Sequence, residues 1–456
     1  MKLNYNIYTI ILLVFVSCSK EFTELAPISE RNADNFYNTA SDMEVAVNAI
    51  YRNLKGNGAF NQSYWILQEL RSDNTFWDGS GLAQDIVNFD VFNEDSNSLI
   101  TKDAWANAYQ GISRANIVLN RIDDISMDAS TKSRITGEAL FLRSFFYYNL
   151  AVLFGNIPLI LSETASADEG FNHQQVAASV VYAQIAADLA LAESALPSKA
   201  STSNGRISKG AAAALLGKVY LTMGDSSNAE SVLRRVLTYG YSLVANYSDL
   251  WGVANEYNNE SIFEVDFQGG LANQGNSFTN QFHGILSESV TSGLRNIPEQ
   301  DLIDAYETGD LRFPASIQGV DGTDTGYTIK FGSVNSFNDD DASNNWPVLR
   351  YADVLLMLAE SLGETNEAYG FINQVRTRAG LAPIDQSTPG TFEDKLLHER
   401  RVELAFENHR WPDLLRMNRA QSVMTAQGKT TRGRLLYAIP LVELELNSNF
   451  SQNPGY

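Results

Sequence analysis

Cysteine and histidine are scarce in this chain of 456 residues, which has one cysteine, Cys18, and four histidines. A single cysteine rules out intrachain disulfide bonds and clustered thiolate metal sites. The sequence also lacks the H-E-x-x-H, G-x-S-x-G and phosphate-loop patterns, so zinc-protease, serine-hydrolase and nucleotide-binding sites have no support. A glycosidase needs only two well-placed carboxylates, but no feature favours one. We expect no enzymatic activity, no catalytic residues and no cofactor.

Positive charge is also in short supply. The chain has 33 Lys and Arg against 54 Asp and Glu, for a formal net charge of −21. A protein that wraps a phosphate backbone carries the opposite excess. No nucleic-acid partner is therefore expected.

Long hydrophobic runs are missing except at the N-terminus. Residues 1–17 read "MKLNYNIYTIILLVFVS", with an apolar run from Ile7 to Val16 that is too short to span a membrane and is typical of a signal-peptide core. Ser17 before Cys18 resembles a bacterial lipobox, although Phe15 departs from its usual leucine. This predicts cleavage before Cys18 and lipid on its sulfur. The alternative is ordinary secretion with a stray cysteine.

Strand-like runs are few, the best being "SIFEVDF" at 261–267 and "GYTIKFG" at 326–332. Helical periodicity dominates instead, and "SDMEVAVNAIYRNL" opens with Ser41 as N-cap and Glu44 completing a capping box. We predict a signal peptide at 1–17, a lipid anchor and extended segment at 18–40, and one domain at 41–456. Its predicted helix pairs are 41–55 with 103–123, 131–154 with 174–196, 206–223 with 225–239, and 347–379 with 392–416. Its irregular stretches are 56–101 and 246–345.

One helix pair carries a repeat signature. Gly217 and Tyr220 on one predicted helix are followed by Ala229, Leu233 and Val236 on the next. This spacing is typical of a tetratricopeptide unit, in which small residues let two antiparallel helices approach closely. A generic helical bundle with alanine-rich contacts remains the alternative.

The most densely charged stretch is "HERRVELAFENHRWPDLLR" at 398–416. Acidic and basic residues nearly balance in it, so it is not a basic strip. Glu399, Arg400, Glu403 and Glu407 have the spacing for ion pairs on a helix, and Pro412 should end that helix near Trp411. We interpret the stretch as a partly buried ion-pair lattice that supports the fold.

Several long motifs carry a family resemblance. They are "EALFLRSFFYYNLAVLFGNIPLI" at 138–160, "NNWPVLRYADVLLMLAES" at 344–361, "INQVRTRAGL" at 372–381, the charged stretch above and the terminal "SQNPGY". In this order they resemble the SusD/RagB family of surface lipoproteins from Bacteroidetes nutrient-uptake systems.

The resemblance implies a mostly α-helical, SusD-like fold of four tetratricopeptide-type helix pairs, an irregular ligand-binding lobe and a few short strands. It also implies a lipid-anchored protein at the outer-membrane surface, acting as a lid on a SusC-like TonB-dependent transporter. Such proteins bind and deliver oligosaccharides, and less often peptides or another nutrient. The family has no shared catalytic residues, so the ligand must be sought in the irregular stretches.

The first candidate site is the aromatic-rich segment 60–85. Sugars present flat C–H faces that stack on aromatic rings, while carboxylates, amides and guanidinium groups bind their hydroxyls. The match to the family's glycan site is one of position in the chain, and core packing is the alternative for each tryptophan. The candidate residues are Tyr64, Trp65, Arg71, Asp73, Asn74, Phe76, Trp77 and Asp78.

A second candidate is the Gly/Asn/Gln-rich segment 268–296, with Phe278, Phe282, His283 and Arg295. It has the composition of an adaptable binding loop, or simply of a long insertion.

Residues 57–101 and 246–300 each hold one basic side chain of Lys or Arg and seven acidic ones. A polyanionic glycan would need clustered Arg or Lys, so a neutral glycan is expected. The acidic run at 338–345 lacks EF-hand spacing, and a solvated loop is favoured over a metal site.

Overall fold

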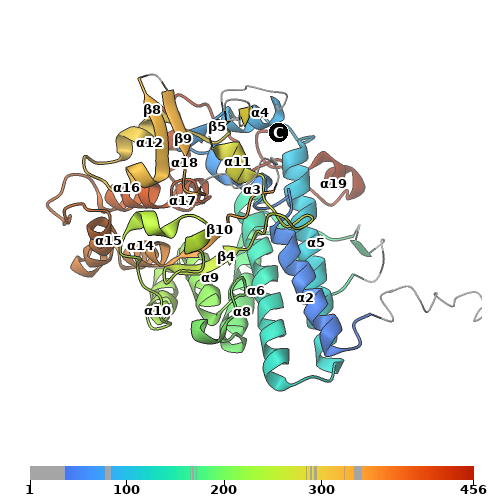
Figure 1. The fold of residues 1–456 in the computed structure, drawn as a ribbon. Coiled ribbons are helices and arrows are strands. Elements are labelled where there is room, and N and C mark those ends of the chain that lie inside the picture. Colours follow the sequence, from blue (N-terminus) through green and yellow to red (C-terminus); the bar gives the residue numbers. More distant parts are fainter. Residues whose placement is uncertain are drawn as a thin grey trace, which may run out of the picture.

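Helices packed in pairs form the lower part of the molecule (Figure 1). The computed structural model describes residues 36–77, 84–164, 166, 169–170, 172–283, 285–287, 290–291, 295–322, 324–332 and 341–456. The helices that contact each other as pairs are α2 (Ala40–Leu54) with α5 (Leu99–Arg121), α6 (Ala129–Phe154) with α8 (Ala178–Ala195), α9 (Lys209–Thr222) with α10 (Ser226–Val236), and α14 (Tyr351–Leu362) with α15 (Asn366–Arg378).

Shorter elements build the upper lobe and the connections. The remaining α-helices are α3 (Ser63–Trp65), α4 (Gln84–Asp90), α11 (Phe278–Phe282), α12 (Gln300–Ala305), α13 (Phe313–Ser316), α16 (Phe392–Leu404), α17 (Arg410–Arg416), α18 (Ala420–Ala426) and α19 (Leu441–Leu446). A π-helix, η2 (Ile66–Leu70), and four 3-10 turns complete them: η3 (Ile122–Asp124), η4 (Lys199–Ser201), η5 (Tyr247–Leu250) and η6 (Val253–Asn255).

Strands within the described residues form two-stranded antiparallel pairs only. They are β1 (Thr75–Phe76) with β7 (Ile297–Pro298), β2 (Ile157–Pro158) with β3 (Gln175–Val176), β4 (Ser261–Val265) with β10 (Trp346–Arg350), β5 (Ile285–Ser287) with β6 (Val290–Thr291), and β8 (Ile317–Asp321) with β9 (Asp324–Thr328). The mostly helical fold class is confirmed.

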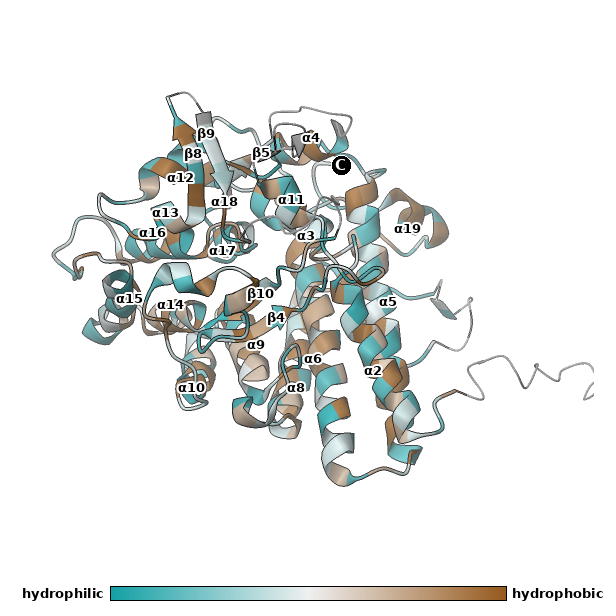
Figure 2. Cartoon of the chain, in the orientation of Figure 1, coloured by the Kyte–Doolittle hydropathy of each residue, from teal (hydrophilic) through white to brown (hydrophobic). Residues whose placement is uncertain are grey.

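Local sequence explains much of the helical part. Gly217 on α9 faces Leu233 on α10 so closely that a Cβ at Gly217 would lie 2.4 Å from a Leu233 methyl group. The small residue therefore sets the distance between these two helices. Figure 2 shows hydrophobic residues on α6 and α9 in the middle of the molecule, where nearly every α6 residue from Ile135 onward is buried.

The structure differs in several places from what the sequence predicts. Helix α2 is capped by Thr39 with Asp42, not by Ser41 with Glu44. The helical region predicted at 347–379 begins instead at Tyr351, since residues 346–350 pair with β4. The stretch 56–101, predicted to be irregular, contains α3, η2 and α4.

The charged helix also ends earlier than predicted. Helix α16 stops at Leu404, and Phe406 and Asn408 adopt positive φ angles of 70° and 67°. Their backbone N–H groups donate to the Glu69 carboxylate at 2.7 and 3.1 Å, which replaces the helical acceptors. Pro412 lies in the first turn of α17, where its missing N–H is not needed.

The acidic residues of α16 and the loop after it lie at the centre of a buried ion-pair network, which we call the charge lattice. Glu403 contacts Arg378 at 2.6 Å, Arg350 at 3.0 Å and Arg312 at 3.3 Å, and Glu407 contacts Arg350 at 2.7 Å. Burial alone would raise the pKa of Glu403, but these guanidinium groups outweigh it and hold the pKa at about 2. The lattice therefore keeps Glu403 charged inside the protein.

Arg400 offers a test of the lattice. Its guanidinium lies between Asp353 at 2.8 Å and Asp413 at 2.7 Å, with no exposed side-chain surface. Arg400→Ala should lower the free energy of unfolding by about 3–5 kcal/mol, because it leaves two buried carboxylates without this partner. Arg419→Ala, which breaks the exposed Arg419–Asp394 pair, should cost less than about 1 kcal/mol. Urea denaturation measures both, and equal losses would contradict the lattice.

His409 should make the protein sensitive to acid. Burial and the Lys218 ammonium, 3.1 Å from His409 Nδ1, lower the pKa of His409 to about 4 despite the nearby carboxylates of Asp353, Asp413 and Glu407. In the unfolded chain its pKa is about 6.5. The neutral imidazole therefore contributes stability that is complete above about pH 6.5 and is lost as the pH falls towards 4.

His409→Gln should remove this contribution, which is at most about 3 kcal/mol for such a shift. The free energy of unfolding should therefore fall less in the variant than in the parent between about pH 7 and about pH 4.5. An equal fall in both proteins would show that His409 is not responsible.

Candidate functional site

The first predicted segment runs largely through the core. Tyr64 and Trp65 are 1% and 0% exposed, and Trp77 is 4% exposed. The Trp65 ring packs edge-on against Phe282, with centroids 5.1 Å apart. An indole without an exposed face cannot stack on a sugar in this conformation, so Trp65 takes the alternative role of core packing. Cys18 and Asp78 lie outside the described residues.

The polar side chains of this segment form buried contacts within the protein. Arg71 is buried in an ion pair with Glu94 at 2.8 Å, and its guanidinium lies 3.7 Å from the centre of the Phe92 ring. Asp73 accepts two hydrogen bonds from Arg410 at 2.7 Å. None of these polar groups is directed to solvent as a sugar ligand would require.

Asn74 supports a neighbouring buried acid. Its side-chain amide donates to the Glu69 carboxylate at 2.8 Å. Burial raises the pKa of Glu69 to about 7, against the hydrogen bonds from Asn74, Phe406 and Asn408. Asn74 and Glu69 thus stabilise the backbone where α16 ends, and they do not face a ligand.

The second predicted segment is also partly buried. Phe278 and Phe282 are fully enclosed, and Phe278 packs against Trp346 and Phe331 with ring centroids 4.9 and 5.1 Å apart. Together with Trp65 they form one aromatic cluster beneath the upper lobe. His283, the next residue along the chain, is only half-buried.

The structure brings the two predicted segments together at the surface of the upper lobe. Strand β1 pairs with β7, so that Phe76 lies opposite Ile297. The Arg295 guanidinium lies 5.5 Å from the centre of the Trp77 ring. Strand β7 in turn lies against β9. The ends of both segments therefore meet in one place.

We call this surface the aromatic patch, made of Phe76, Trp77, His283, Arg295 and Tyr327. All except Trp77 are half-buried, and the rings of His283 and Tyr327 lie 5.0 Å apart. Partial burial lowers the pKa of His283, so the imidazole is neutral at neutral pH. The patch offers ring faces together with hydroxyl, imidazole and guanidinium groups.

The sequence did not single out Tyr327. It lies in "GYTIKFG", which reads only as a strand, and its place beside His283 depends on how β9 packs. A tyrosine on a predicted strand that follows a candidate loop was the one available signal.

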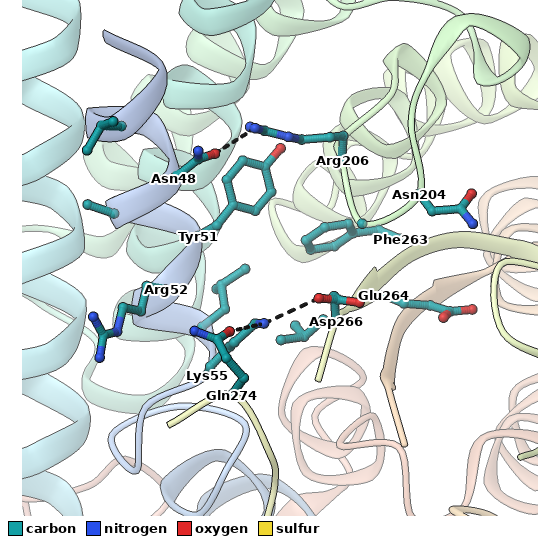
Figure 3. Close-up of a pocket in the computed structure, with 15 residues that line it drawn as sticks. Asn48, Tyr51, Arg52, Lys55, Asn204, Arg206, Phe263, Glu264, Asp266 and Gln274 are labelled. Carbon is teal, nitrogen blue, oxygen red and sulfur yellow. Dashed lines mark hydrogen bonds and ion pairs between the residues drawn. The ribbon is translucent and has the colours of Figure 1, made fainter. Parts of the chain in front are cut away.

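A separate recess opens between α2 and β4 (Figure 3), with a volume of about 480 Å³. Tyr51 and Phe263 border one side of it. Lys55, Asp266 and Gln274 border the other, with Lys55 Nζ 2.8 Å from Gln274 Oε1 and 3.3 Å from Asp266 Oδ2. We call it the α2–β4 pocket.

Metal and membrane sites find no support in the part of the chain that is described. No group of three or more His, Cys, Asp or Glu side chains is arranged there to hold a metal ion. No helix there combines the length and hydrophobicity needed to cross a membrane. Of the acidic run at 338–345, residues 338–340 lie outside the described residues.

Comparison with known proteins places the chain in a family. Residues 314–456 match the model described as "SusD family", and residues 26–221 match "Starch-binding associating with outer membrane". A solved "Laminarin binding SusD-like protein" is 31% identical, with a TM-score of 0.81, over 92% of this chain and 100% of that one. The chain belongs to the SusD family.

Two curated relatives extend this likeness. SusD-like protein P2 of Formosa agariphila is 26% identical over 98% of this chain and 99% of its own length. The starch-binding protein SusD of Bacteroides thetaiotaomicron is 23% identical over 88% and 87% of the two lengths. The SusD family consists of glycan-binding proteins associated with the outer membrane, not of enzymes.

Proposed function

We propose that this SusD protein binds a neutral oligosaccharide on the aromatic patch. The observation that carries the proposal is the convergence of Phe76 and Trp77 with His283, Arg295 and Tyr327 on one partly exposed surface. Loops and short strands presented by a rigid scaffold are where binding residues usually lie. Half-buried rings can stack on sugar faces while the polar groups bind hydroxyls.

A neutral ligand is supported by how the basic residues are used. The sequence segments around the patch supply Arg71 and Arg295. Arg71 already forms a buried ion pair with Glu94. Arg295 alone does not make the cluster of cations that a polyanionic glycan needs. Laminarin oligosaccharides are the first ligands to test, because the similar solved protein is named as laminarin-binding. Starch oligosaccharides are the second.

We also propose that lipid on Cys18 anchors the protein at the outer-membrane surface. There it acts as the lid of a SusC-like TonB-dependent transporter and delivers the oligosaccharide to it. The support is the lipobox-like sequence around Cys18 and the outer-membrane association in the description of the matching family model.

The binding proposal predicts a loss of affinity in two patch variants. Tyr327→Ala and Phe76→Ala should each weaken laminarin-oligosaccharide binding about thirtyfold, or ~2 kcal/mol, the scale of a binding hot spot. Tyr182→Ala, which removes a half-buried tyrosine on α8, is the matched control and should bind like the parent. Calorimetric titration measures all three.

Two other results would count against this proposal. If the patch variants bind as tightly as Tyr182→Ala, the patch is not the site. If the parent binds peptides and no oligosaccharide, the ligand is a different nutrient.

The anchor proposal predicts that Cys18→Ala leaves the outer-membrane fraction. One acyl chain binds a membrane weakly, whereas the several chains of a bacterial lipoprotein hold firmly. Cell fractionation in a strain without the partner transporter measures this, because the transporter could retain the protein by itself. Retention of the variant there would overturn the anchor.

The lid proposal predicts a partner. The parent, extracted in mild detergent, should co-purify with a TonB-dependent transporter identified by mass spectrometry.

A further inference from the structure

The α2–β4 pocket is separate from the aromatic patch. Figure 1 shows α2 and β4 well below β8 and β9, which carry the patch residue Tyr327. Its walls come from α2, from the loop before α9 at 204–206, from β4 and from Gln274. At about 480 Å³ its volume lies within the range of roughly 300–1,000 Å³ that is common for small-molecule sites.

One wall is a fixed set of polar groups. Lys55 Nζ donates to Gln274 Oε1 and contacts Asp266 Oδ2. The Tyr257 hydroxyl donates to the other oxygen of Asp266 at 2.7 Å. Each group is thus held by a second one, which reduces the entropy lost on binding. An ammonium beside a carboxylate gives a donor and an acceptor at the spacing that two neighbouring hydroxyls require.

The opposite wall presents the half-buried ring of Tyr51, beside Phe263, which is only 3% exposed. Figure 3 shows the rings of Tyr51 and Phe263 across the open space from Lys55 and Asp266. The Arg206 guanidinium lies 5.1 Å from the centre of the Tyr51 ring, and the Tyr51 hydroxyl accepts from Ile207 N at 3.0 Å. A ring between these two walls would contact aromatic carbon on one side and hydrogen-bonding groups on the other.

Two of the cations that line the pocket are held in ion pairs. Lys55 is paired with Asp266, and Arg206 is paired with Glu138 at 3.1 Å. The Arg52 side chain also lines the rim, but it points away from the polar wall (Figure 3). An anion beside Lys55 or Arg206 would meet a cation that already has a carboxylate partner. A neutral ligand rich in hydroxyl groups fits this arrangement better.

We infer that the α2–β4 pocket is a second saccharide site, which holds one or two rings of a neutral sugar. The ligand class rests on the proposed function, whereas the site itself rests on the geometry of the pocket. Two sites on one chain would raise the avidity for a long glycan that reaches both.

The test uses saturation-transfer NMR with laminaribiose and maltose as probes and D-glucuronate as the charged comparison. Tyr327→Ala weakens the patch about thirtyfold, and in that background Lys55→Met removes the donor of the polar wall. We expect Tyr327→Ala to retain weak binding of a neutral disaccharide. Adding Lys55→Met should weaken it about tenfold or more, equivalent to about 1.4 kcal/mol. The two neutral disaccharides should bind more tightly than D-glucuronate.

Arg52→Met is the matched control, because it removes a cation from the same helix without touching the polar wall. It should leave disaccharide binding unchanged. Equal effects of Lys55→Met and Arg52→Met would overturn the inference, as would tighter binding of D-glucuronate.

The test separates this inference from the proposed function. If Tyr327→Ala abolishes all sugar binding, the second site does not exist and the patch is upheld. If Tyr327→Ala has no effect and Lys55→Met abolishes binding in the parent, the pocket is upheld and the patch is not the glycan site.

Discussion

The charge lattice around α16 is the constraint on which the rest of the structure depends. The side chains of Glu399, Glu403 and Glu407 are fully buried, and an unpaired buried charge costs several kcal/mol. Their partners come from different parts of the chain: the residue before α13, strand β10 and helix α15 supply guanidinium groups. Satisfying the acids therefore fixes the upper lobe against the helix pairs. The lattice also explains how a chain of strongly negative net charge concentrates its arginines inside.

Periodicity and spacing in the sequence made the helix pairs predictable. The helix ends and the break after α16 were not predictable, because tertiary contacts determine them. Gly217 and Leu233 show their close approach in sequence spacing alone. The start of α2 was misplaced by two residues because two capping boxes overlap there, and the pair of Thr39 and Asp42 is the one formed. The break after α16 was not foreseen, since its acceptor is Glu69, more than 300 residues away in sequence.

The candidate site was likewise predictable only in part, because composition marks a segment but does not record its tertiary contacts. Composition singled out both segments that meet at the aromatic patch, but it gave no measure of burial. Trp65 lies inside because α3 and η2 turn it towards Phe282, and no local pattern records that direction. The α2–β4 pocket was invisible for a related reason, because Lys55 is 211 residues from Asp266 and 219 from Gln274.

The contacts between Asp73 and Arg410 join positions 337 residues apart, and this separation bears on the order of assembly. Helix pairs such as α9 and α10 close over short loops, so their contacts can form while the chain is still being made. The core of the upper lobe cannot do so. A chain that ends before α16 has no cation from that region for Asp73 and no backbone N–H groups of Phe406 and Asn408 for Glu69. The surroundings of Glu69 and Asp73 are thus completed only when residues 406–410 are in place.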